Sequence, residues 1–279
     1  MKECSESGRN ALKEKRVITS YLAGKNNGAV ILSEDEGTSV LLNGEDHVRI
    51  QVLCNGMDIQ SCFKKANEID DYIDAHFDYA FDEKYGYKTT YPTNTGTGMK
   101  AGYTLHLPSL SDARRLNDIS AELGRFGLKF RTVYGDGQNG YGNLYQISTQ
   151  KTLGQDEREV IKDLDDIVLQ IVNQEKEQRE HFYKKDKIQM DDEIYKSYGV
   201  LKYARKLSLK DSMVLISELM TGVSLGVLQF AHNGRYNINE LIMDIQPAVL
   251  RQNSGKAMSV AETDVLRAEY IRKYLPEII

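Results

Sequence analysis

The stretch Tyr91-Pro92-Thr93-Asn94-Thr95-Gly96-Thr97-Gly98-Met99-Lys100-Ala101-Gly102 is the most informative part of this 279-residue chain. It combines three glycines with short hydroxyl side chains, and its lysine lies just before a predicted strand. A loop of this composition offers backbone donors that can hold phosphate groups. It has neither the Walker spacing nor the dinucleotide fingerprint, so an ordinary turn between two strands is the alternative.

Two further segments place carboxylates close to cations. They are Asn43-Gly44-Glu45-Asp46-His47-Val48-Arg49 upstream and Arg131-Thr132-Val133-Tyr134-Gly135-Asp136 downstream. Such residues suit phosphoryl transfer, in which a protein mainly positions the reactants and neutralises phosphate charge. On a strand, Glu45, His47 and Arg49 would share one face. The alternative is a solvated strand face with a weak ion pair.

The loop Gly135–Gly142 also contains several glycines and bears one acid, Asp136. A mobile loop of this kind could close over a substrate and exclude water. The alternative is an ordinary hairpin connection. The histidines are scattered and predict no metal site, so His47 and His106 are expected to have structural, hydrogen-bonded roles.

Composition excludes several classes of protein. The net charge of −5 argues against a general nucleic-acid binder, and no segment is apolar enough to predict a membrane span. The N-terminus lacks a signal peptide. Cys4, Cys54 and Cys62 show no metal-ligand spacing. Cys54 and Cys62 could pair, but a reduced cytoplasmic protein is the favoured interpretation.

Apolar periodicity predicts an α+β fold. Strands are expected at 29–32, 39–42, 47–53, 103–107, 128–134 and 143–148, and helices at 59–76, at 109–124 and from about 160 onwards. A serine-x-x-acid pattern at Ser208 predicts another helix start. We therefore expect a mainly antiparallel sheet with covering helices over residues 1–178. An all-helical domain should follow over residues 179–279, with the boundary in the charged stretch 174–187.

The ordered segments resemble the ATP:guanidino phosphotransferases, or phosphagen kinases. The similarity includes Leu105-His106-Leu107-Pro108 and Gly142–Ser148, and it runs from about residue 28 to the C-terminus. Tyr195–Leu201 and the helical tail extend it towards the bacterial protein-arginine kinase branch. The resemblance implies the catalytic fold that phosphagen kinases share with glutamine synthetase.

The resemblance also implies roles for individual residues. Glu45 matches the carboxylate that holds and activates the acceptor guanidinium, and Asp136 matches a second, loop-borne catalytic carboxylate. The implied nucleotide-binding residues are Arg49, Lys100, Ala101, Gly102, Tyr103, Thr104, Arg131, Thr132, Val133, Tyr134, Gly135 and Asp136. In the tail, Thr263, Asp264, Arg267 and Ala268 match a phosphoarginine-binding motif.

The implied reaction is transfer of the γ-phosphoryl group of ATP, with Mg²⁺, to arginine side chains of proteins, which marks them for Clp-type proteolysis. The implied partners are protein substrates with exposed arginine, a Clp-type protease system and an activator protein. Nucleic acid and membranes are not expected as partners, and a homodimer is left open. The alternative function is an inactive or truncated kinase-like module that binds phosphoarginine or a protein partner.

The chain departs from the family pattern at several positions. The family's N-terminal helical region and arginine-rich strand have no counterpart here, so we expect an N-terminally truncated catalytic domain. Tyr91 replaces a cysteine, Lys100 an arginine, Asp136 a glutamate and Thr263 an arginine. Lysine keeps the charge of arginine but loses its two-pronged geometry.

Overall fold

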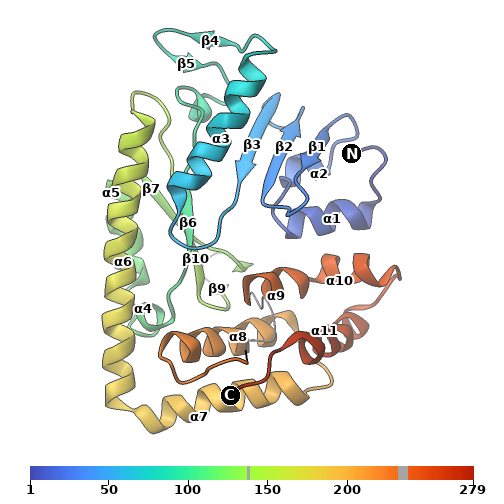
Figure 1. Cartoon of the computed structure of the whole chain (residues 1–279), viewed down its shortest axis with the longest axis vertical. Helices are drawn as coiled ribbons and strands as arrows, with labels where there is room; N and C mark the ends of the chain where they lie inside the picture. The colour runs from blue at the N-terminus through green and yellow to red at the C-terminus, as the bar shows by residue number, and fades with distance from the viewer. Residues whose placement is uncertain (137–138, 232–237) are drawn as a thin grey trace. The chain divides into compact units, whose positions relative to one another are not determined.

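The computed structural model describes residues 1–136, 139–231 and 238–279 (Figure 1). The chain divides into two units that alternate along the sequence. Unit 1 comprises residues 1–103, 120–130 and 146–170, and unit 2 comprises residues 104–119, 131–145 and 171–279. Each unit is described by itself. The predicted domain boundary at 178/179 lies inside one continuous helix, α6 (Glu157–Lys185), and stays a prediction.

The first sheet of unit 1 has three antiparallel strands. Its strands are β1 (Ala29–Leu32), β2 (Thr38–Leu42) and β3 (Val48–Val52), in the order β1-β2-β3. Two helices precede them, α1 (Glu6–Glu14) and α2 (Ser20–Ala23). Val17, Ile18, Leu22 and Leu41 form the buried core of this part. The predicted hairpin is confirmed, because alternating apolar residues bury one face against this core.

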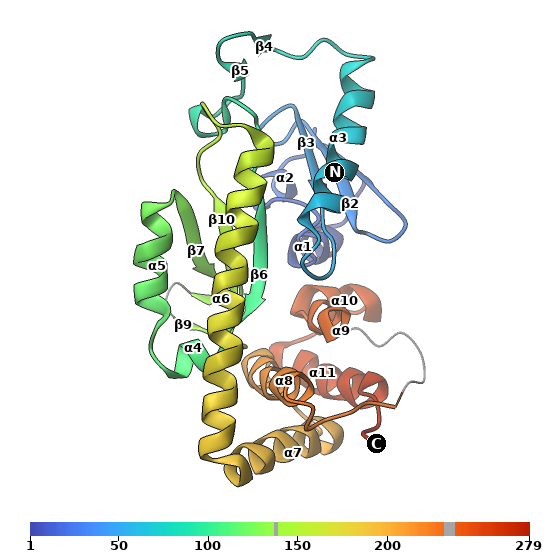
Figure 2. The same ribbon diagram turned by 60° about the vertical axis from the view of Figure 1, so that its left-hand side comes forward.

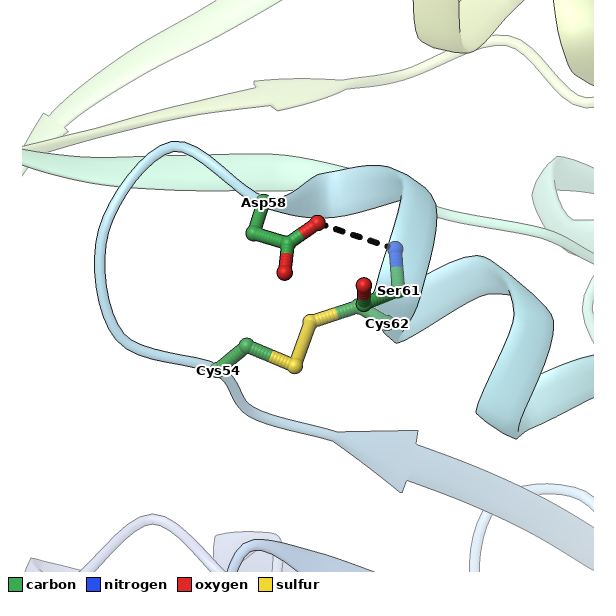
Figure 3. Close-up of a disulfide and its surroundings, with 4 residues drawn as sticks. All are labelled: Cys54, Asp58, Ser61 and Cys62. Atoms are coloured by element: carbon green, nitrogen blue, oxygen red, sulfur yellow. Dashed lines mark hydrogen bonds between the residues drawn. A yellow bond between two sulfur atoms is a disulfide. The ribbon is translucent and has the colours of Figure 1, made fainter.

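The connection from β3 to α3 (Ile59–Asp74) carries a disulfide between Cys54 and Cys62 (Figure 3). Asp58 caps the helix by accepting a hydrogen bond from the Ser61 amide at 3.2 Å. The chain turns back at this cap, so the two Cα atoms lie 6.2 Å apart, a normal separation for a disulfide. The structure therefore pairs Cys54 with Cys62, the alternative that the sequence left open, and the predicted helix is confirmed.

Beyond α3 the chain forms a short hairpin that the sequence did not predict. It consists of β4 (Phe81–Asp82) and β5 (Gly86–Tyr87), and the 3₁₀ helix η1 (Pro92–Asn94) follows. Figure 2 shows the hairpin following the C-terminal end of α3. The ladder continues from Tyr87 to an isolated bridge with Gly96.

The second three-stranded sheet has the order β6-β10-β7 and confirms the predicted strands. It consists of β6 (Gly102–His106), β7 (Leu128–Thr132) and β10 (Leu144–Thr149). A Cβ on Gly102 would lie 2.6 Å from the Ile147 carbonyl oxygen, so only glycine fits this crossing of β6 and β10. Between β7 and β10, β8 (Gly135–Asp136) pairs antiparallel with β9 (Asn139–Gly140), which is the hairpin alternative for this segment. Gly137 and Gln138 lie outside the described residues.

The single helix predicted at 109–124 is wrong, because the chain forms two helices there. They are α4 (Pro108–Asp112) and α5 (Leu116–Arg125). Pro108 occupies the first turn of α4, and Ser109 is not its cap. Arg114 has a φ of 56°, in the left-handed region, and this conformation ends the first helix.

A buried carboxylate replaces the missing cap within unit 2. Glu175 Oε1 accepts from the Ser109 amide at 3.1 Å, and Oε2 accepts from the Leu110 amide at 2.9 Å. Arg179 donates to Glu175 at 2.9 Å and also donates to the hydroxyl of Ser224. Glu175 and Arg179 are 2% and 7% exposed, and breaking such a pair costs about 3–5 kcal/mol.

The described part of the chain after α6 is helical, as predicted. Its helices are α7 (Lys187–Tyr203), α8 (Leu209–Ser224), α9 (Ile238–Asp244), α10 (Pro247–Ser254) and α11 (Val260–Tyr274). Ser208 caps α8 by accepting from the Asp211 amide at 3.1 Å, which confirms the predicted start. The core includes Ile194, Leu201, Met213, Ile216, Leu219 and Ile271.

His106 joins β6 to α8 within unit 2, and the structural role predicted for it is confirmed. Its Nε2 and the Ser217 hydroxyl lie 2.8 Å apart, and the same hydroxyl accepts from Asn143 Nδ2 at 3.1 Å. Burial, with a smaller contribution from the Arg179 charge, lowers the pKa of His106 from 6.5 to about 3. The imidazole is therefore neutral in the folded chain at neutral pH.

This pKa makes the stability of the fold depend on pH. Below about pH 6.5 the unfolded chain protonates His106 while the folded chain does not, so the free energy of unfolding falls as the pH is lowered towards about 3. Urea unfolding between about pH 7 and pH 5 should show this slope, at most ~1.4 kcal/mol per pH unit from this residue. His106→Gln should flatten the slope, and the exposed control His181→Gln should leave it unchanged. Equal slopes in the parent and His106→Gln would contradict the prediction.

Candidate active site

The turn before β3 holds Glu45. Asn43 has a φ of 57°, and its amide donates to the His47 carbonyl at 2.8 Å, so residues 43–47 form a tight turn. β3 starts only at Val48. The prediction that Glu45, His47 and Arg49 share one strand face is therefore wrong, because the left-handed residue bends the chain before the strand begins.

Glu45 is half-buried and held by the N-terminal segment of unit 1. Thr19 Oγ1 donates to Glu45 Oε2 at 2.9 Å. The Thr19 hydroxyl oxygen also caps α2, because it accepts from the Leu22 amide at 3.1 Å. Lys25 Nζ donates to the Gly44 carbonyl at 3.3 Å. Sequence reasoning missed Thr19 and Lys25, which lie far from Glu45 along the chain.

Asp46 ties the same turn to residues 91–102, from here on called the glycine-rich segment. Its Oδ1 accepts from the Thr90 amide at 2.7 Å, and its Oδ2 accepts from Asn94 Nδ2 at 3.0 Å. Asn94 Oδ1 in turn accepts from Lys100 Nζ at 2.5 Å. A hydrogen-bonded path therefore runs from Lys100 through Asn94 to Asp46, the residue next to Glu45.

Several backbone donors of the glycine-rich segment form hydrogen bonds inside unit 1. The amides that donate to protein acceptors include those of Asn94, Thr95, Gly96, Thr97, Met99 and Ala101. Thr152 anchors the segment, since its hydroxyl donates to the Thr95 carbonyl at 2.6 Å. These bonds favour the turn alternative over a backbone cradle for phosphate. Side-chain cations are then the groups that can bind phosphate.

Two cations of unit 1, Arg49 and Lys129, are near enough to Lys100 to act on its charge; these three residues are here called the cationic cluster. Burial and then Arg49 lower the pKa of Lys100, Lys129 adds to this, and Asp46 opposes it. Arg49 and Lys129 are exposed on β3 and β7. Several cations around one carboxylate can neutralise the negative charge of a polyphosphate.

The predicted stretch from Ala101 to Thr104 includes both core and accessible positions. The Ala101 amide donates to Thr149 Oγ1 at 3.0 Å, which fixes the start of β6. Tyr103 is buried and its hydroxyl donates to Asp165; burial, then this bond, raises the pKa of Tyr103. Gly102 and Thr104 are exposed, so they are the positions here that a ligand can reach.

The predicted stretch Arg131–Asp136 lies in unit 2. Arg131 is exposed at the end of β7, and Thr132 is half-buried beside Gly140. The Val133 amide donates to the Leu144 carbonyl at 2.9 Å, and the Tyr134 ring stacks on Tyr141 with centroids 6.4 Å apart. Gly135 and Asp136 form β8. The structure therefore groups these residues in unit 2 and groups Glu45 with the cationic cluster in unit 1.

In the tail, Arg267 of α11 is an internal structural group. It is 1% exposed; its Nε donates to the Ile245 carbonyl at 2.9 Å, and its Nη1 donates to the Leu207 carbonyl at 2.9 Å and to Asp264 Oδ1 at 2.6 Å. Ala268 is fully buried beside it. This arginine ties α11 to the residue after α9 and to the segment before α8.

Thr263, which stands where the motif has an arginine, is also buried, at 1% exposure. Its hydroxyl accepts from Arg251 Nε at 3.1 Å and donates to the Ser259 carbonyl at 2.8 Å. The phosphoarginine-binding role of the motif stays a prediction.

Within the described ranges, no three His, Cys, Asp or Glu side chains are grouped so that they could hold a metal ion. Over the same ranges, every helix is too short or too polar to cross a membrane. Unit 1, all of whose residues are described, therefore offers no carboxylate cage for a resident metal.

Comparison with known proteins accounts for both parts of the chain. The family model described as ATP:guanido phosphotransferase, C-terminal catalytic domain, matches residues 1–178. The chain belongs to this family. A second model, the protein-arginine kinase McsB C-terminal domain, matches residues 187–278. The predicted family and class of enzyme, a guanidino phosphotransferase, are confirmed.

Two relatives of this ATP:guanido phosphotransferase bear the name protein-arginine kinase. The chain is 40% identical to that of Bacillus pumilus and 39% identical to that of Bacillus subtilis, in each case over 99% of this chain and 75% of the relative. A solved structure, the duplicated taurocyamine kinase from Schistosoma mansoni, matches with a TM-score of 0.54 at 20% identity. That match covers 62% of this chain and 25% of that chain. It supports the α+β fold alone.

The cationic cluster makes Lys129 a testable phosphate contact. Lys129→Ala should raise the dissociation constant of ATP by about three- to fivefold, because an exposed ion pair contributes up to ~1 kcal/mol. The effect should shrink at high salt. Isothermal titration of the full chain measures this, with the exposed Lys64→Ala of α3 as the matched control. Equal effects of the two substitutions would remove Lys129 from the cluster.

Proposed function

We propose that the chain transfers the γ-phosphoryl group of MgATP to the guanidinium of arginine side chains in proteins. The observation that carries the proposal is the link, within unit 1, between the turn bearing Glu45 and the cationic cluster, through Asp46, Asn94 and Lys100. A carboxylate for a guanidinium and cations for phosphate are thereby built on one scaffold. The names of the relatives support the choice of arginine.

Glu45 is the proposed catalytic base. A guanidinium has a pKa above ~12 and is a poor nucleophile while it is protonated. A paired carboxylate aligns it for attack and accepts its proton. Thr19 is a positioning residue, because its hydroxyl fixes one oxygen of Glu45.

Arg49, Lys100 and Lys129 are the proposed phosphate-binding groups of unit 1, and Arg131 has the same proposed role in unit 2. Their charges neutralise the transferring phosphoryl group. Mg²⁺ enters with the nucleotide and is held by its phosphate oxygens, where it offsets further negative charge. Asp136 is the proposed second carboxylate. Ala101–Thr104 and Thr132–Gly135 are the proposed stretches around the nucleotide.

The proposed setting is the cytoplasm, where phosphorylation marks proteins for a Clp-type protease. Protein substrates with exposed arginine follow from the reaction itself. An activator protein, a homodimer and a phosphoarginine-binding tail belong to the same proposal. It is supported by the match of the C-terminal family model to residues 187–278.

Glu45→Gln tests the proposal most directly. The amide keeps the shape of the side chain but loses the charge that pairs with and deprotonates arginine. Phosphoarginine formation on a protein substrate should fall by ~100-fold or more, with ATP affinity nearly unchanged. Arg49→Ala should weaken ATP binding as well as turnover, because Arg49 holds phosphate. Phosphoarginine is measured at neutral pH, since the P–N bond is labile in acid.

The matched control is Glu34→Gln, an exposed acid in the β1–β2 turn, which should leave the rate unchanged. Equal rates for Glu45→Gln and the parent chain would remove Glu45 from the mechanism. Absence of phosphoarginine with the parent chain would favour the non-catalytic module.

A further inference from the structure

Unit 1 contains a pocket that the proposed reaction does not use. Its volume is about 290 Å³, and its lining includes Phe81, Tyr85, Tyr87, Thr97 and Glu157. It lies between the β4–β5 hairpin, the glycine-rich segment and the start of α6. The volume is at the lower end of the range for ligand sites, so the pocket suits one side chain better than a nucleotide.

Two aromatic rings at this pocket are exposed and a third is half-buried. Phe81 and Tyr85 are 54% and 50% exposed, and Tyr87 is the half-buried ring. The Phe81 and Tyr87 rings meet edge to face at 5.3 Å between centroids, and Tyr79 meets Tyr87 in the same way at 5.4 Å. Such an accessible group of rings is typical of a binding surface.

Carboxylates lie behind these rings. Tyr79 and Tyr87 donate from their hydroxyls to Asp70 Oδ1 and Oδ2, each at 3.0 Å. Glu157 lines the pocket itself, and burial, followed by the charges of Asp70 and Asp156, raises its pKa. A cation in the pocket would offset this clustered negative charge.

The surrounding segment is strongly acidic. Residues 70–88 contain six carboxylates, Asp70, Asp71, Asp74, Asp78, Asp82 and Glu83, against two lysines, Lys84 and Lys88. Lys88 pairs with Asp82 at 3.5 Å. Lys84 Nζ lies 5.1 Å from the centroid of the Tyr85 ring, so a cation of the chain itself already uses one of these aromatic faces.

We propose that this pocket docks an arginine side chain of the protein substrate, separate from the arginine at Glu45. The guanidinium stacks on Tyr85 and Phe81 and donates to Glu157, and its methylene stem covers apolar ring surface. Arginine suits the pocket better than lysine because its planar, weakly hydrated head stacks on rings. The inference rests on the proposed function, since the docked protein is the one that is phosphorylated.

The test measures binding without nucleotide, so it does not depend on activity. Three fluorescein-labelled glycine-serine peptides, carrying one arginine, one citrulline or one lysine, are titrated with the full-length chain by fluorescence anisotropy. The Glu45→Gln variant serves as the background, so that the reaction site contributes little. The arginine peptide should bind more tightly than the lysine peptide, and the citrulline peptide most weakly.

Substitutions in the pocket should then weaken the arginine peptide and leave the citrulline peptide unchanged. Glu157→Gln and Tyr85→Leu should each raise its dissociation constant by about fivefold, as expected for one lost cation contact. The leucine keeps apolar bulk and removes the aromatic face, so it separates stacking from packing. Matched controls are Glu159→Gln, an exposed acid on the same helix, and Phe126→Ala, an exposed ring elsewhere in unit 1. Both should bind the peptide like the parent.

Equal binding of the arginine and citrulline peptides, or equal effects of Glu157→Gln and Glu159→Gln, would overturn the inference. A phosphoarginine assay in the Glu45 parent keeps the two proposals apart. Phosphoarginine without any Glu157-dependent binding would sink the docking site and leave the proposed reaction standing. Glu157-dependent binding without phosphoarginine would support an arginine-binding pocket and reject the reaction.

Discussion

The two hydrogen bonds that Asp46 accepts are the constraint on which the candidate site depends. A carboxylate that accepts from a backbone amide and a side-chain amide fixes both donors in direction and distance, and its charge strengthens both bonds. Through Thr90 and Asn94 it joins the turn before β3 to the segment that ends in Lys100. Since β3 also carries Arg49, the Asp46 side chain helps to set the spacing between the proposed base Glu45 and the two cations Arg49 and Lys100.

Local patterns were sufficient to predict most elements of the fold. Two short apolar runs separated by a turn predicted β1 and β2, alternation predicted β3, and three-to-four-residue spacing predicted α3, because these signals lie within a few residues. The split between α4 and α5 could not be predicted in this way. The donors of α4 are satisfied by Glu175, more than sixty residues away, and Arg114 adopts a conformation that its sequence neighbours do not signal.

The candidate site shows the same division. The resemblance supplied Glu45, Arg49 and Lys100, whereas Thr19, Lys129 and the pocket around Tyr85 become visible only when distant segments meet. The glycine-rich segment is the clearest case, because its composition fits a phosphate cradle and a turn equally well. Only its hydrogen bonds, with Gly96 pressed against the Thr152 carbonyl, distinguish the two. Tertiary contacts therefore decide what the same residues can do.

The continuity of α6 has a consequence for the inheritance of this chain. The helix α6 is continuous (Figure 1). The first family match ends within it at residue 178, between Glu175 and Arg179, which lie one turn apart. A recombination event at that point would leave a buried carboxylate without its guanidinium and the amides of α4 beside an uncompensated charge. The two matched regions are therefore expected to be inherited as one unit, because gene fusion or domain shuffling at this position in α6 would produce unstable proteins.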